Sequence, residues 1–231
     1  MFYSNRSIPV RVRIGLSILL AVLVAPSMQD LPSVPVVSPQ GMLILAKELL
    51  IGAAIGFVVR LLFSSLEMAG HLAGLQMGLG FATFYDPQHS TNVPIIAQLM
   101  SLLMLLVFLA FNGHLIMLRA LFDSFVQLPI QAAPADASGF LLVAQFGEII
   151  FRVGLMLSLP VLAALLVTNL AIGVMTRAAS QLNVFAIGFP ITLAIGAVAL
   201  YLLLPFLLPH IDALLGEITR FYLKMLDSFA V

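Results

Sequence analysis

The sequence has no cysteine and no tryptophan, and charged side chains make up only 9% of its 231 residues. Without cysteine the chain can form no disulfide, no thiolate metal site and no cysteine nucleophile. Its 10 basic and 10 acidic residues give a net charge of zero. There is also no basic cluster of the kind that neutralises phosphates, so we expect no nucleic-acid partner.

Apolar residues dominate what remains. They make up 62% of the chain, whereas a soluble domain is about 45–50% apolar. The composition predicts an all-α integral membrane protein, and a helix needs about 20 apolar residues to cross a bilayer. Apolar segments predict about five hydrophobic helices, arranged as helical hairpins, at residues 14–28, 42–63, 93–111, 140–176 and 184–208. The first is short and the fourth is too long for one span, so we expect a kink at Pro160.

The positions of the arginines predict an orientation. Arg11 and Arg13 precede the first apolar segment, Arg60 ends the second and Arg177 follows the fourth. By the positive-inside rule these ends face the cytoplasm. The basic start followed by an apolar run is also similar to a secretory signal peptide, an alternative that would leave a protein of the same class.

A glycine-rich segment, residues 74–87, interrupts this apolar chain. Each glycine costs about 1 kcal/mol in a helix interior relative to alanine, and unpaired backbone cannot face lipid. The segment is therefore predicted to be a broken element that lines a pore or a gate, where bulky side chains on glycine hinges fill and vacate a narrow opening. The candidate plug residues are Met77, Gly78, Gly80, Phe81, Phe84 and Tyr85.

Two further patterns predict contacts. Gly70, Gly74 and Gly78 recur every four residues, which would place them on one helix face and let another backbone approach closely. The alternative is a glycine-tolerant hairpin without a function beyond packing. Polar residues near the connection between the last two apolar segments are candidate contacts to other subunits, because polar groups at membrane depth usually face a partner. They are Asn169, Arg177, Gln181 and Asn183.

Other polar residues have plainer interpretations. A lone histidine, His114 in Phe111-Asn112-Gly113-His114, is interpreted as structural rather than as a metal ligand, and the Asn-Gly pair is expected to stop a helix. Lys47 and Glu48 are adjacent, so we expect them to point to different faces and to need separate partners. No zinc-protease motif, nucleophile elbow or phosphate loop is present. We expect no enzyme activity, no catalytic residue, no metal and no cofactor.

The glycine-rich segment, the Phe-Asn-Gly-His motif and Gln-Leu-Asn-Val-Phe-Ala-Ile-Gly-Phe-Pro, in this order, closely resemble the FliR family of flagellar biosynthesis proteins. The resemblance runs from about Ser7 to the last apolar segment. It implies a subunit of the flagellar type III export gate in the bacterial inner membrane, at the flagellar basal body. In that family one copy assembles with several copies of FliP and FliQ into a helical channel for unfolded flagellar proteins, working with FlhA and FlhB. The resemblance also implies that residues 77–93 occlude the closed channel.

The sequence departs from the family at two places. Family members begin with a further apolar helix, and we expect that this sequence lacks it. Residues 1–231 are expected to form a single membrane domain. Ser180 stands where the family typically has proline. Two alternatives remain at this point: the related injectisome export-gate family, and a small-molecule secondary transporter. A transporter should show two matching halves, which the sequence does not show.

Overall fold

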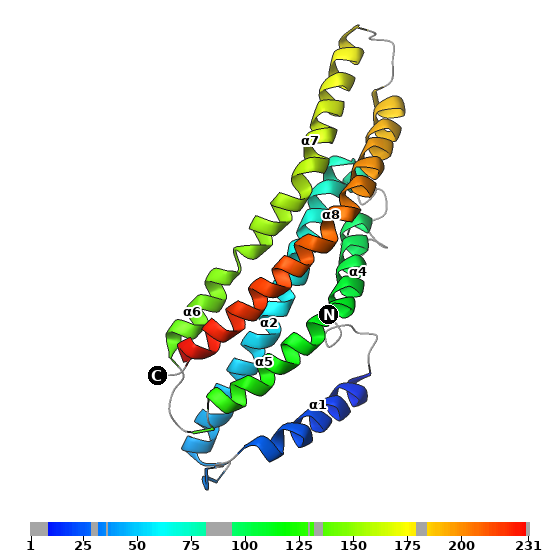
Figure 1. Ribbon diagram of the computed structural model, residues 1–231. Helices are drawn as coiled ribbons and strands as arrows, with labels where there is room; N and C mark the ends of the chain where they lie inside the picture. The colour runs from blue at the N-terminus through cyan, green and yellow to red at the C-terminus, as the bar shows by residue number, and fades with distance from the viewer. Residues whose placement is uncertain are drawn as a thin grey trace. The chain divides into compact units, whose positions relative to one another are not determined.

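The computed structural model describes residues 9–28, 32–35, 37–81, 94–128, 130–131, 136–178 and 184–229. All regular structure in these ranges is helical (Figure 1), which confirms the predicted all-α fold. The elements are α1 (Val10–Val24), η1 (Ala25–Ser27), α2 (Pro39–Gln76), η2 (Leu79–Phe81), α4 (Ile95–Ala110), α5 (Gly113–Gln127), α6 (Ala137–Phe146), α7 (Ile149–Ala178) and α8 (Val184–Phe229).

The number of membrane-length helices is smaller than the five expected. Among the described residues, three helical stretches are long and apolar enough to cross a membrane: Pro39–Gln76, Ala137–Ala178 and Ala186–Phe229. A fourth span results if the bent pair α4 and α5 counts as one. The first predicted segment forms α1, whose 15 residues fall short of the about 20 that a span requires.

Two helix breaks have local causes in the sequence. Asn112, between α4 and α5, has a left-handed backbone with φ 55°, a conformation that asparagine tolerates better than most residues. This confirms that Asn-Gly stops the helix. The long fourth segment is interrupted at Gly147, between α6 and α7, whereas α7 continues through Pro160, where we expected the kink.

The chain forms two compact units, and α2 and α8 contribute residues to both. Unit 1 comprises Met1–Arg60, Asn112–Gly147 and Leu215–Val231, and unit 2 comprises Leu61–Phe111 and Glu148–Leu214.

Side-chain contacts hold the helices of unit 1 together. Tyr222 on α8 is 3% exposed and donates a hydrogen bond from its hydroxyl to the Ile55 carbonyl on α2, at 2.8 Å. The end of α8 lies along α6 (Figure 1), where the rings of Phe140 and Phe229 pack edge to face with centroids 4.8 Å apart. Aromatic rings and buried hydrogen bonds thus join these helices, which are distant in the sequence.

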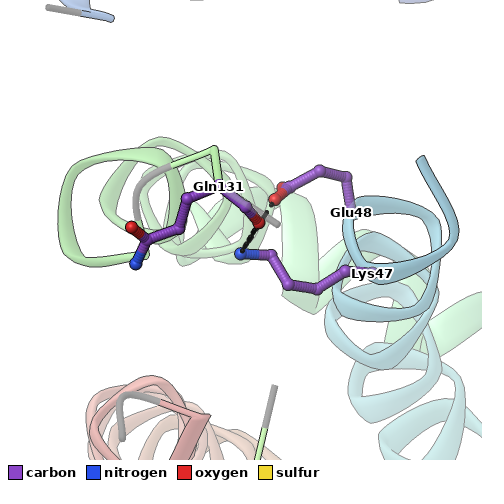
Figure 2. A network of polar contacts seen from close by, with 3 residues as sticks. All are labelled: Lys47, Glu48 and Gln131. Carbon is purple, nitrogen blue, oxygen red and sulfur yellow. Dashed lines mark hydrogen bonds and ion pairs between the residues drawn. The ribbon is translucent and has the colours of Figure 1, made fainter. Parts of the chain in front are cut away.

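Lys47 and Glu48 also belong to unit 1, and they interact with each other. Lys47 Nζ lies 3.7 Å from Glu48 Oε1 and donates a hydrogen bond to the Gln131 carbonyl at 3.3 Å. Figure 2 shows both side chains turned toward Gln131. Our expectation of separate partners was wrong, because the long side chains of these neighbouring residues converge and the Lys47 ammonium serves both the Glu48 carboxylate and the Gln131 carbonyl. Through the Lys47 hydrogen bond, the N-terminal part of α2 contacts the connection that follows α5.

Candidate functional site: the glycine-rich end of α2

The helix α2 ends at Gln76, and Gly78 follows it with φ 84°. The Gly78 amide donates a hydrogen bond to the Leu75 carbonyl at 3.0 Å, which satisfies one of the carbonyls left without a partner at a helix end. A residue with a Cβ would be strained at this φ. Gly78 therefore lies beyond the helix, and the three-glycine stripe is shortened to Gly70 and Gly74.

These two glycines lie against α4 in unit 2. A Cβ on Gly70 would come within 2.6 Å of the Ala97 Cα and 2.8 Å of the Ile96 carbonyl oxygen. On Gly74 it would meet the Ile96 side chain at an ordinary 3.6 Å. The absence of a side chain at Gly70 is thus what allows the backbones of α2 and α4 to approach. Whether the stripe also serves assembly with other subunits stays a prediction.

A polar contact accompanies this close approach. The Ser101 hydroxyl on α4 donates a hydrogen bond to Glu67 Oε1 on α2, at 3.2 Å. Ser101 is only 5% exposed, so its hydroxyl requires a partner. The sequence analysis missed this pair, because the 34 residues that separate its members carry no pairing signal.

Met77 is a core residue of unit 2. It is 3% exposed, its carbonyl accepts a hydrogen bond from the Thr192 hydroxyl, and its side chain covers Gly196 on α8. A Cβ on Gly80 would approach the Leu75 side chain at 3.1 Å. Phe81 ends η2, while Phe84 and Tyr85 lie outside the described residues. The structure thus describes the beginning of the predicted plug segment.

Two of the four predicted subunit contacts, Asn169 and Arg177, lie in the C-terminal part of α7. Asn169 and Arg177 are both exposed, and Arg177 occupies the last helical turn, where a positive charge interacts favourably with the helix dipole. Gln181 and Asn183 lie outside the described residues. Large apolar side chains nearby are also exposed, at Leu166, Val167, Leu170 and Val174.

The imidazole of His114 has a buried Nδ1 for which the described part of the chain offers no hydrogen-bond partner. In the same described ranges, no group of three histidine, cysteine or acidic side chains is placed to hold a metal ion.

Comparison with known proteins places the sequence in a family. The sequence matches the profile of bacterial export proteins, family 1, over residues 1–218. The chain belongs to this family. It is 44% identical over 216 residues to the flagellar biosynthetic protein FliR of Pectobacterium carotovorum subsp. carotovorum. The aligned region covers 94% of this chain and 82% of that protein. For FliR of Escherichia coli (strain K12) the identity is 43%, covering 93% and 82%.

The similarity extends to FliR of Bacillus subtilis (strain 168), at 30% identity over 201 residues, covering 86% of this chain and 77% of that protein. As a member of the FliR family, the chain is a subunit of the flagellar type III export gate, and its apolar helices make it a membrane protein. The family is a structural component of the export apparatus and not an enzyme family. The injectisome and transporter alternatives are not favoured.

Proposed function

We propose that this subunit assembles with FliP and FliQ homologues into a helical channel in the bacterial inner membrane, at the flagellar basal body. Unfolded flagellar proteins pass through the channel, and FlhA and FlhB act with it. Family membership supports this assembly. The exposed apolar side chains of α7 also support it, because an exposed apolar surface of this kind is suited to partner helices or to lipid.

We further propose that residues 77–93 close the channel at rest. The observation that carries this proposal is the abrupt end of α2 at Gln76. Gly78 has a positive φ and follows, in the sequence, the part of α2 that packs closely on α4. Backbone that leaves a helix inside an apolar protein must be covered by protein or line a cavity. The phenylalanine and tyrosine side chains of the segment suit a stopper that excludes water and ions, whereas the Met77 side chain packs on α8.

The experiment shortens residues 82–93 by four residues in a flagellated cell and measures ion conductance and flagellin secretion together. We expect the membrane to leak small ions while secretion continues, because the opening loses its stopper and the channel wall remains. Removing residues 132–135 from another connection is the matched control for a shortened chain. Unchanged conductance in the shortened gate would refute the plug.

Arg177 provides a second test of the assembly. We propose that Asn169 and Arg177, with Gln181 and Asn183, bind acceptor groups on other gate subunits. The exposed position of Arg177 supports this, since its guanidinium stays charged and benefits from partners. Arg177→Ala should lower motility and flagellin secretion at a nearly unchanged protein level, with Arg177→Lys retaining the charge as control. Loss of the protein itself would show that Arg177 supports folding of its own chain.

A further inference from the structure

The carbonyl of Met77, the residue directly after α2, accepts a hydrogen bond from another helix. Carbonyls at the C-terminal end of a helix have no partner within the helix, and buried ones must find a donor elsewhere. The Met77 oxygen accepts a hydrogen bond from the Thr192 hydroxyl at 3.3 Å, across 115 residues of sequence. Thr192 lies on α8 within the same unit and is 8% exposed. The donor is thus a buried side chain that water does not readily replace.

The Thr192 hydroxyl has a second acceptor close by. The Phe189 carbonyl, one turn earlier on α8, lies 3.0 Å from the same oxygen. A hydroxyl carries one hydrogen, so the two carbonyls compete for it. When the end of α2 moves away, Thr192 can return its hydrogen to its own helix without leaving an unsatisfied donor. Release of Met77 is therefore inexpensive for α8.

The side chain of Met77 contacts the same face of α8. A Cβ on Gly196 would lie 2.5 Å from the Met77 Cγ and 2.8 Å from its Sδ. Because Thr192 and Gly196 are four residues apart on a helix, they face the same side. Met77, the residue directly after α2, thus contacts α8 twice: its carbonyl accepts a hydrogen bond from Thr192, and its side chain packs over Gly196.

We propose that Thr192 and Gly196 are positioning residues of the gate, and that together with Met77 they form a latch that holds the end of α2 in the closed state. We call these three residues the Met77 latch. The proposal rests on the proposed plug, because Met77 is the first residue of the plug segment 77–93 and directly precedes the Gly78 turn. A displacement of this face of α8 releases Met77 and moves the beginning of that segment.

The first test changes the hydroxyl and leaves the helix face almost unaltered. Gate complexes carrying Thr192→Val or Thr192→Ser are reconstituted with their partner subunits, and their resting ion conductance is measured in planar bilayers. We expect Thr192→Val to raise the resting conductance severalfold and Thr192→Ser to stay near the unaltered protein. If both variants lower the yield of the complex alike and neither alters conductance, Thr192 is a folding residue and the latch is refuted.

The second test changes the space that Met77 occupies. Gly196→Ala places a methyl carbon 2.5 Å from the Met77 Cγ, closer than two non-bonded carbon atoms can approach, so we expect a leak. Combining it with Met77→Ala removes the Cγ, and we expect the double variant to leak less than Gly196→Ala alone. A double variant that leaks as much as or more than Gly196→Ala would overturn the steric part of the proposal.

The two sets of variants separate the latch from the plug. If shortening residues 82–93 causes a leak and the Thr192 and Gly196 variants do not, the latch is refuted and the plug stands. If the latch variants leak and the shortened segment does not, the plug is refuted, and the contact of Met77 with α8 is itself the closure.

Discussion

Two glycine pairs on the same helix have opposite surroundings. Gly52 and Gly56 lie in the part of α2 that belongs to unit 1, and Gly70 and Gly74 lie in the part that belongs to unit 2. Both pairs are spaced by four residues. A Cβ on Gly52 or Gly56 would meet no atom within 4 Å, whereas one on Gly70 would lie 2.6 Å from the Ala97 Cα. One spacing therefore serves close backbone packing in one unit and leaves an open face in the other.

The two parts of α2 also differ in the way they contact other helices. In unit 2 glycines bring helices together, as at Gly154, where a Cβ would come within 2.8 Å of the Met68 side chain. In unit 1 side chains span the distance, as in the Tyr222 hydrogen bond to Ile55 and the Lys47 contact to Gln131. Along α2 we therefore expect the unit 2 part to respond most to added volume at Gly70, and the unit 1 part to the loss of a functional group. The contrast is confined to α2, because a Cβ on Gly139 of unit 1 would collide with the Phe229 ring.

The largest effect is expected from Gly70→Ala. The added methyl would collide with α4 backbone rather than with a movable side chain, so we expect a loss of about 3 kcal/mol through overpacking. The measurement is the thermal unfolding midpoint in detergent, together with recovery of the intact gate complex.

Matched alanine variants sharpen this test. Gly52→Ala should be neutral or stabilising by up to about 1 kcal/mol, because alanine is the better helix former and its methyl meets nothing. Gly74→Ala, with ordinary contacts, should fall between them. Equal destabilisation by Gly70→Ala and Gly52→Ala would remove the distinction between the two units.

A smaller loss is expected from Lys47→Met in unit 1. The side chains of Lys47 and Glu48 are 10% and 22% exposed, so removing the ammonium leaves a half-buried carboxylate without its cation. We expect about 2 kcal/mol of destabilisation, measured by the same unfolding midpoint. The double variant Lys47→Met with Glu48→Gln should recover much of it, and a double variant as unstable as the single one would show that the pair is not coupled.

Tyr222→Phe should have a still smaller effect. It removes the donor to the Ile55 carbonyl and keeps the buried ring, and a hydrogen bond of this kind contributes about 1 kcal/mol. Tyr201→Phe, on an exposed tyrosine of the same helix, is the matched control. If the two variants unfold at the same temperature, the Tyr222 hydroxyl does not hold α2 and α8 together.

The smallest effect concerns pH. The backbone amide of Ser138 donates a hydrogen bond to the Asp136 carboxylate that caps α6 and thereby lowers the pKa of this carboxyl. A lowered pKa in the folded state means that the stabilisation is present above the ordinary pKa of aspartate and is lost as pH falls through the lowered value. Asp136→Asn keeps a capping side chain that does not titrate. We expect the variant to lose less stability than the unaltered protein on acidification, and parallel pH profiles would contradict the cap.

Local features of the fold could be predicted because they depend on neighbouring residues. The apolar composition predicted helices, Asn112 with Gly113 predicted the end of α4, and the glycines after Gln76 predicted a break where Gly78 has a positive φ. The first apolar segment was overcounted as a span, and α2 extends past the expected end at residue 63. Its continuation through Gly70 is stabilised by packing on α4, which outweighs the low helix propensity of glycine.

By itself the sequence determined the membrane class, the helical content, the family and the place where α2 breaks. The tertiary structure decided which glycines are close-packed, that Glu48 and the Gln131 carbonyl share the Lys47 ammonium, and that Met77 contacts Thr192 and Gly196. The reason is physical: backbone conformation follows from a few adjacent residues, whereas a contact across 84 or 115 residues exists only once the helices have packed. Identical spacings such as Gly52 to Gly56 and Gly70 to Gly74 then acquire different surroundings, which no local pattern distinguishes.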